Sequence, residues 1–166
     1  MKAITAPEMM DFEPFRGAVE RWFSLRGTQG LPAFAQWDLE QDPLKDYRMI
    51  ARVQADPLWV QYETVGAELE NLYGKPITGQ NLDTLYNDWF RKIAYRGYRF
   101  TLEHGVPALE KRMISTIVRQ IGYIKIHLPM GNAHGVDHVV TYLLPSGGVF
   151  KRRMDWEAMV KATPWL

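Results

Sequence analysis

The four histidines are the side chains of this sequence with the widest range of possible chemistry. His134 and His138 are four residues apart with Asp137 between them, and such side chains can bind a transition metal. Their surroundings have the composition of a hairpin turn followed by a strand. In a strand, two residues at this spacing lie about 13 Å apart, which is too far for one ion. We therefore interpret both histidines as solvated and predict no metal site.

Sequence motifs of catalysis are missing from the chain. It has no cysteine, which excludes a cysteine nucleophile, a disulfide scaffold and any thiolate metal or iron–sulfur site. It also lacks a Gly-x-Ser-x-Gly motif, a P-loop and a dinucleotide-binding glycine motif. We therefore predict that the protein is not an enzyme, and an enzyme that processes a small molecule is the least favoured alternative.

The composition indicates one folded protein with almost no net charge. Hydrophobic residues make up 46% and aromatic residues 13% of the 166 residues, and 20 basic side chains oppose 19 acidic ones. This is enough for a core without a metal or disulfide, and the charge gives no general basis for nucleic-acid binding. No apolar run approaches the roughly 18 residues that span a bilayer, and residues 1–11 lack the core of a secretion signal. We expect a cytoplasmic location.

Hydrophobic periodicity predicts an α+β protein with two groups of strands and helices between them. Five strands are expected, at residues 49–54, 58–65, 108–116, 120–129 and 136–145. The intervening helices end in one long helix, from about residue 88 to His104. Such an order favours an antiparallel sheet with these helices on one face.

Aromatic side chains are predicted to gather between the sheet and these helices. In the long helix, Trp89, Ile93 and Phe100 share the side that should face the core. Together with tyrosines of neighbouring elements, they are predicted to hold a small organic ligand. The candidate ligand-binding residues are Tyr62, Tyr73, Trp89, Ile93, Phe100 and Tyr142. The alternative is a filled hydrophobic core, which would suit a structural protein–protein adaptor.

The chain is predicted to divide into a helical extension at residues 1–30, a main domain at 31–150 and a tail at 151–166. The extension contains an amphipathic helix over residues 13–26. Such a helix must cover another surface or pair with a copy of itself. We therefore predict a homodimer whose interface contains Phe15, Val19, Trp22 and Phe23.

The block from Tyr62 to Leu85 resembles the PAS-like domains of small alphaproteobacterial proteins. The matching elements are Val65-Gly66, Leu72-Tyr73-Gly74, Ile77-Thr78-Gly79 and Leu82-Asp83. The segments Leu31-Pro32 and Ile126-His127-Leu128-Pro129-Met130 are also similar to that family. The resemblance extends over about residues 31–147.

This resemblance implies a five-stranded antiparallel sheet of strand order 2-1-5-4-3, with helices on one face and, in many relatives, a pocket for a ligand or cofactor. It also implies a stand-alone sensory or signalling module that acts on a separate effector protein. Some heme-binding members place their iron ligand on the long helix, which makes His104 a candidate heme ligand. We favour the alternative that His104 interacts with the negative end of its helix, and we expect no heme. Photochemistry through a reactive cysteine is excluded, because the chain has none.

Overall fold

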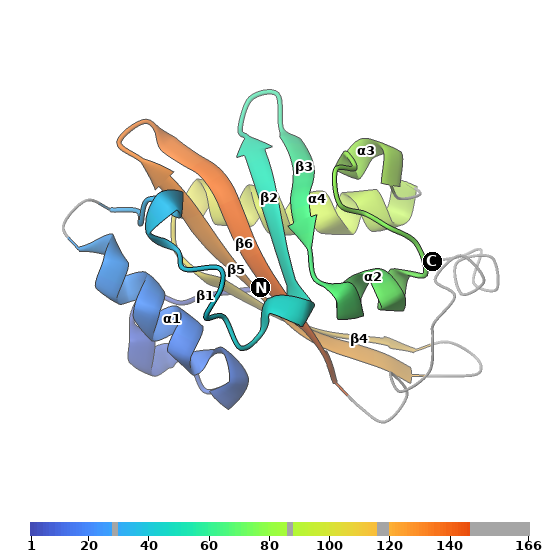
Figure 1. Cartoon of the computed structure of the whole chain (residues 1–166), viewed down its shortest axis with the longest axis horizontal. Helices are drawn as coiled ribbons and strands as arrows, with labels where there is room; N and C mark the ends of the chain where they lie inside the picture. The colour runs from blue at the N-terminus through green and yellow to red at the C-terminus, as the bar shows by residue number, and fades with distance from the viewer. Residues whose placement is uncertain (28–29, 86–87, 116–119, 147–166) are drawn as a thin grey trace.

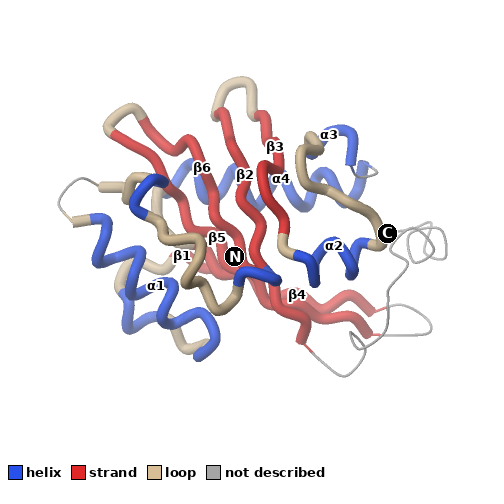
Figure 2. Tube along the Cα trace, viewed as in Figure 1, coloured by secondary structure: helices blue, strands red, loops and turns tan. Residues whose placement is uncertain are grey.

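A computed structural model describes residues 1–27, 30–85, 88–115 and 120–146. In these residues an antiparallel sheet forms the middle layer, and helices lie on both of its faces (Figures 1 and 2). The predicted tail at residues 151–166 lies outside the described part. None of the helices in that part is long and apolar enough to span a bilayer.

The sheet has the predicted topology with one strand added. Its strands are β1 (Lys2–Ala3), β2 (Arg48–Gln54), β3 (Trp59–Val65), β4 (Ala108–Ser115), β5 (Gln120–Asn132) and β6 (Gly135–Ser146). They lie in the order β1-β4-β5-β6-β2-β3, and every neighbouring pair is antiparallel. Counted from β2, the five longer strands have the order 2-1-5-4-3, which confirms the predicted fold class. The sixth strand, β1, pairs with β4 at one edge.

Four α-helices cover the sheet, and they are divided between its two faces. Helices α2 (Ala67–Tyr73), α3 (Leu82–Leu85) and α4 (Asp88–His104) pack on one face. Helix α1 (Glu13–Arg26) packs on the other, together with the segment that leads into β2 (Figure 1). Short 3₁₀ turns are present at Pro7–Met9, Phe34–Gln36 and Lys45–Tyr47. The sheet therefore has two buried faces and two hydrophobic cores.

The core under α1 corrects the predicted dimer interface. Phe15, Val19 and Trp22 are fully buried against the sheet of their own chain, at 0% exposure. The indole Nε1 of Trp22 donates a hydrogen bond to the carbonyl oxygen of Pro129, at 2.6 Å. Phe23 is half-buried and packs edge-on against Trp22. These side chains thus pack inside their own chain, because α1 is the one α-helix of the described residues that covers the second apolar face of the sheet.

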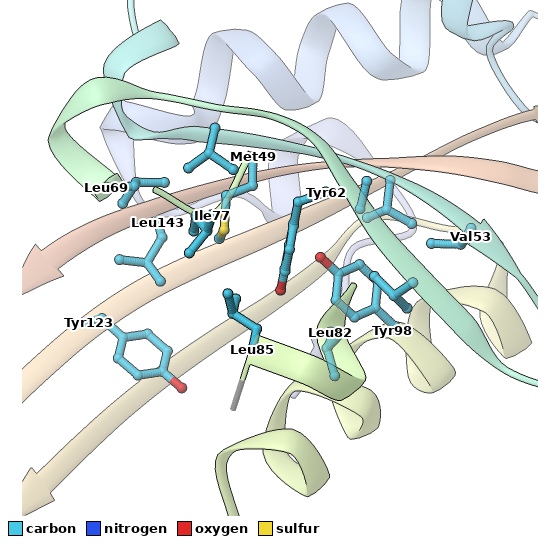
Figure 3. Packing of buried hydrophobic residues seen from close by; sticks show 14 residues of the cluster. Met49, Val53, Tyr62, Leu69, Ile77, Leu82, Leu85, Tyr98, Tyr123 and Leu143 are labelled. Carbon is cyan, nitrogen blue, oxygen red and sulfur yellow. The ribbon is translucent and has the colours of Figure 1, made fainter. Parts of the chain in front are cut away.

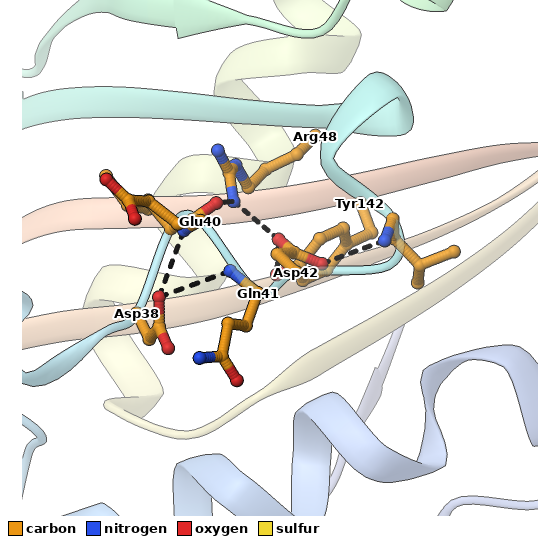
Figure 4. Close-up of polar contacts among 8 residues, drawn as sticks. Asp38, Glu40, Gln41, Asp42, Arg48 and Tyr142 are labelled. Atoms are coloured by element: carbon orange, nitrogen blue, oxygen red, sulfur yellow. Dashed lines mark hydrogen bonds and ion pairs between the residues drawn. The ribbon is translucent and has the colours of Figure 1, made fainter.

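A buried polar network holds the segment before β2 on this same face (Figure 4). The carboxylate of Asp42 accepts hydrogen bonds from the guanidinium of Arg48 and the hydroxyl of Tyr142, both at 2.6 Å. Arg48 also donates to the carbonyl oxygen of Leu39. Nearby, Asp38 Oδ1 accepts hydrogen bonds from two backbone amides of the following turn. The network fastens an irregular segment to strands β2 and β6.

The second core lies under α2, α3 and α4 (Figure 3). Helix α2 ends at Gly74, whose φ of 72° is the left-handed cap conformation that glycine accepts without strain. The carboxylate of Glu70 then accepts hydrogen bonds from the backbone amides of Ile77 and Thr78, which buries Ile77. This core contains the tyrosines Tyr62, Tyr98 and Tyr123 as well as aliphatic side chains.

Candidate ligand-binding site

A cavity of about 60 Å³ lies between the sheet and helices α2 and α4. Its apolar walls come from Met49 of β2, Ile93 and Ala94 of α4, and Leu143 of β6. Since these side chains belong to one helix and to two neighbouring strands, the cavity is part of the interface that joins the helical layer to the sheet.

Polar side chains supply the rest of the lining. Four are tyrosines and two are titratable nitrogen groups, namely Tyr62, Tyr73, Tyr98, Tyr123, Lys125 and His127. Tyr123, Lys125 and His127 are every second residue of β5, so their side chains point to one face of the strand. The other face of β5, with Ile124, Ile126 and Leu128, packs toward α1.

Half of the predicted ligand-binding residues lie at this cavity. Tyr62, Tyr73 and Ile93 line it, as expected. Tyr142 does not, because its side chain lies on the opposite face of the sheet and donates to Asp42. Phe100 is half-buried and stacks on His104 instead of lining the cavity. The side chain of Trp89 is outside the described part.

His104 lies away from the cavity, at the exposed end of α4. Its Nδ1 is 2.8 Å from the carbonyl oxygen of Phe100, and the two rings stack with centroids 4.0 Å apart. This is the interaction with the last carbonyl groups of a helix that we favoured from the sequence. The position gives His104 no contact with the cavity, so it does not support a role as heme ligand.

A cluster of ion pairs lies beside the cavity on β4 and β5. Lys125 Nζ is 2.9 Å from Glu110 Oε2, and Arg112 donates two hydrogen bonds to Glu110 Oε1. The side chains of Lys125 and Glu110 are only 9% and 5% exposed, whereas that of Arg112 is 20% exposed. Two cations therefore share one buried carboxylate.

The charges of this cluster shift the acidities of its members. Burial alone would raise the pKa of Glu110, but Lys125 and Arg112 lower it to about 2. Burial lowers the pKa of the Lys125 ammonium, and Glu110 opposes that shift. Burial, and then the negative charge of Glu110, raise the pKa of the Tyr123 hydroxyl, so it is a neutral hydrogen-bond donor at neutral pH. The cavity is thus lined by both an ammonium group and a neutral hydroxyl group, and the ammonium of Lys125 lies over the Tyr123 ring at 5.6 Å from its centroid.

His127 is the second titratable group of the lining, and it is 1% exposed. Its Nδ1 is 2.8 Å from Thr141 Oγ1, while Nε2 has no hydrogen-bond partner among the described residues. Burial, and then the nearby Lys125, lower its pKa well below the ordinary value, which keeps the ring neutral. Nε2 faces Gly97 of α4, where a Cβ atom would lie only 2.8 Å away.

Tyr98, Tyr123, Lys125 and His127 were not predicted as site residues from the sequence. Polar and apolar side chains alternate in residues 120–129, and this alternation alone does not show that a helix covers the polar half. The feature that could have identified these residues is the interior position of this strand in the sheet. Helices can pack on both faces of an interior strand, so its polar side chains can be buried. Lys125 and His127 then lie where a helix covers them.

The strand order, together with the helical layer over the cavity, defines a PAS-like α+β domain. No family model and no curated protein sequence matches the chain. Similar solved structures include a light-oxygen-voltage domain studied with a flavin analogue, at 14% identity, a TM-score of 0.44, and coverage of 92% of this chain and 95% of that one.

Two further structures are PAS domains. One belongs to a LuxR-family transcriptional regulator from Burkholderia thailandensis in complex with ethanol, at 13% identity, a TM-score of 0.40, and coverage of 64% of this chain and 92% of that one. The other comes from Bordetella pertussis BvgS, at 10% identity, a TM-score of 0.38, and coverage of 72% and 86%.

Proposed function

We propose that the protein is a sensory or signalling module that binds a small organic ligand in the cavity between the sheet and helices α2 and α4. The observation that carries this proposal is the lining. Four tyrosines, Lys125 and His127 converge on one space whose remaining walls are apolar. A concave apolar site with a few convergent polar groups is the usual form of a small-molecule site.

The alternative of an adaptor with a filled core explains this lining less well. A core that only supports the fold is stabilised by apolar side chains, whereas buried charged groups lose hydration energy. Lys125 and Glu110 form an ion pair that is almost fully buried, and Nε2 of His127 has no hydrogen-bond partner in the described part of the chain. In a ligand-binding site, these buried polar groups would interact with the ligand, whereas a filled core offers them no such partner.

Catalysis is not part of the proposal. The pair of Thr141 and His127 has the hydroxyl–imidazole distance of an activated nucleophile, at 2.8 Å. Thr141 is fully buried, however, and it does not line the cavity. A hydroxyl group that no substrate can reach is better explained as a hydrogen-bond partner that orients the His127 ring.

Ligand binding would be signalled by a change in the arrangement of helices α2 and α4, which form one wall of the cavity. Ile93, Ala94 and Tyr98 of α4 and Tyr73 of α2 contribute to the lining, so a bound ligand favours one arrangement of these helices over the sheet. Such a bias shifts the population of conformations that a separate effector protein encounters. The proposed effector therefore recognises the helical side of the sheet.

The proposal is tested by thermal unfolding of the full chain against a library of small organic compounds. A ligand at 100 times its Kd stabilises a protein by about 2.7 kcal/mol, which raises the Tm of a chain of this size by about 5–10 °C. Ala94→Leu should fill the cavity and abolish that rise. Lys92→Leu is the control, because it introduces the same side chain at an exposed position of α4. Equal rises in both variants, or no stabilising compound, would contradict the proposal.

A further inference from the structure

We propose that the ligand of this cavity is a short-chain monocarboxylate whose carboxylate group binds to the ammonium group of Lys125. The inference rests on the proposed function and specifies the class of molecule that the cavity takes. It follows from three observations, which are the surplus of positive charge, the hydrogen-bond donors beside it and the size of the cavity.

The first observation is the charge balance of the ion-pair cluster. Among the described residues, Glu110 is the one carboxylate in contact with both Lys125 and Arg112, so these three side chains carry a surplus of one positive charge. Arg96, on the exposed side of α4, adds to the positive potential at Lys125. No acidic side chain is among the described residues that line the cavity. An anionic ligand balances this charge, and a cationic ligand adds to it.

The second observation is the set of donors at the cavity wall. An ammonium group has three N–H donors, and the ion pair with Glu110 Oε2 at 2.9 Å does not use all of them. Lys125 can therefore donate to a ligand while it keeps its partner on β4. Tyr123 precedes it by two positions on the same face of β5 and also lines the cavity, so its protonated hydroxyl is a second donor there. Charge-assisted hydrogen bonds of this kind are the strong ones.

The third observation is the volume. A cavity of about 60 Å³ holds only a few water molecules, since each needs roughly 10–15 Å³ measured in this way. The space therefore takes a molecule of about four to six non-hydrogen atoms. With a carboxylate group at Lys125, one to three carbon atoms remain, and these would lie against Ala94, Ile93 and Met49.

The test is isothermal titration calorimetry of the full chain with sodium propionate at constant ionic strength. Propionamide is the reference compound, because it has the same number of non-hydrogen atoms and no charge. We expect propionate to bind at least tenfold more tightly than propionamide. Lys125→Met should abolish this preference, whereas Lys111→Met, which removes an exposed lysine of β4, should keep it.

Removal of Lys125 alone leaves Glu110 buried with one partner fewer, and that variant can fail to fold. The double variant Lys125→Met, Glu110→Gln removes both charges of the buried pair and serves in its place. Nuclear magnetic resonance of the wild type gives a second measurement. Propionate should shift the backbone amides of Tyr123, Lys125 and Ala94 more than those of α1.

The outcomes separate the inference from the proposed function. Equal affinity for propionate and propionamide would overturn the carboxylate assignment and leave the cavity as a site for neutral molecules. Propionate binding that survives the loss of Lys125 would overturn it as well, by placing the anion elsewhere. If neither compound binds, the short-chain monocarboxylate is wrong, while the library screen with Ala94→Leu still decides whether the cavity binds a ligand.

Discussion

Gly97 of α4 and His127 of β5 lie directly against each other: a Cβ atom at Gly97 would be 2.8 Å from Nε2 of His127. The imidazole ring has little freedom to move aside, because Thr141 contacts its Nδ1 and Tyr98 packs against it at 5.2 Å between ring centroids. Because glycine has no side chain, α4 can approach the sheet closely at Gly97, and this approach sets the width of the cavity.

The first prediction concerns this contact. Gly97→Ala should lower stability, because overpacking costs about 1–3 kcal/mol and outweighs the gain of about 1 kcal/mol in helix propensity. In a His127→Ala background the same change should become neutral or stabilising. Chemical denaturation of the four proteins of this cycle measures the coupling, which we expect to be about 1–3 kcal/mol.

Gly17 is the matched control for that cycle. It lies in the exposed part of α1, and a Cβ atom there would have no neighbour within 4 Å. Gly17→Ala should therefore stabilise the protein by up to about 1 kcal/mol. Additive effects of Gly97→Ala and His127→Ala would show that the two residues do not limit the approach of α4.

The second prediction compares two hydrogen bonds from a tyrosine to an aspartate. Tyr142 donates to the buried Asp42 at 2.6 Å, and Tyr95 donates to the exposed Asp83 at 2.8 Å. Tyr142→Phe should cost about 1–3 kcal/mol, because a buried carboxylate loses a partner. Tyr95→Phe should cost less than about 1 kcal/mol, because water replaces the hydroxyl group. Urea unfolding measures both, and equal losses would contradict the role assigned to the Asp42 network.

The third prediction concerns α1. Trp22→Ala should destabilise the chain by about 3–5 kcal/mol, since it empties a fully buried site on the sheet. Phe23→Ala should cost less, because Phe23 is half-buried. Denaturation should be combined with light scattering of the folded variants. If Trp22→Ala changes the number of subunits and leaves stability unaltered, the placement of α1 on its own sheet is wrong.

The fourth prediction is a pH dependence that belongs to Glu110. Because its pKa is lowered to about 2 from the ordinary 4.5, the carboxylate stabilises the folded state above about pH 4.5. That stabilisation is lost as the pH falls toward 2, and it is on the order of 3 kcal/mol.

Glu110→Gln isolates this effect. The difference in unfolding free energy between the wild type and the variant should be largest near pH 6 and should shrink as the pH approaches 2. Denaturation at a series of pH values measures it. A difference that is the same at all pH values would show that Glu110 is not held as an anion by Lys125 and Arg112.

The helices and strands were predictable because each long element has a local signal, whereas the strand order was implied by the resemblance to PAS-like domains. Alternation indicates the strands, and a glycine such as Gly74 or Gly105 is favoured directly after a helix. The two residues of β1 have no such signal, since their pairing with Leu109 and Ala108 depends on the rest of the sheet. The place of α1 could not be read from its sequence either, because an amphipathic helix fits its own sheet and a second copy equally well.

The cavity was predictable in location and only partly in composition. Hydrophobic patterns predict that Tyr62, Tyr73 and Ile93 line the cavity. The side of β5 that faces α4 is polar, however, and its sequence predicts exposure to solvent. For the same reason the buried side of α4 includes Tyr98 and Thr101 in place of Phe100. Hydrophobicity identifies a buried face only where that face packs against apolar side chains.

The most direct test of the central claim is where a bound molecule lies. Two-dimensional NMR of the isotope-labelled full chain with the best compound of the library screen maps the site residue by residue. The account predicts saturable shifts at Ala94, Tyr98, Tyr123, Lys125 and His127, with the α1 face of the sheet unchanged. Saturable shifts centred on α1, or none near α4 and β5, would contradict a ligand site between the sheet and its helical layer.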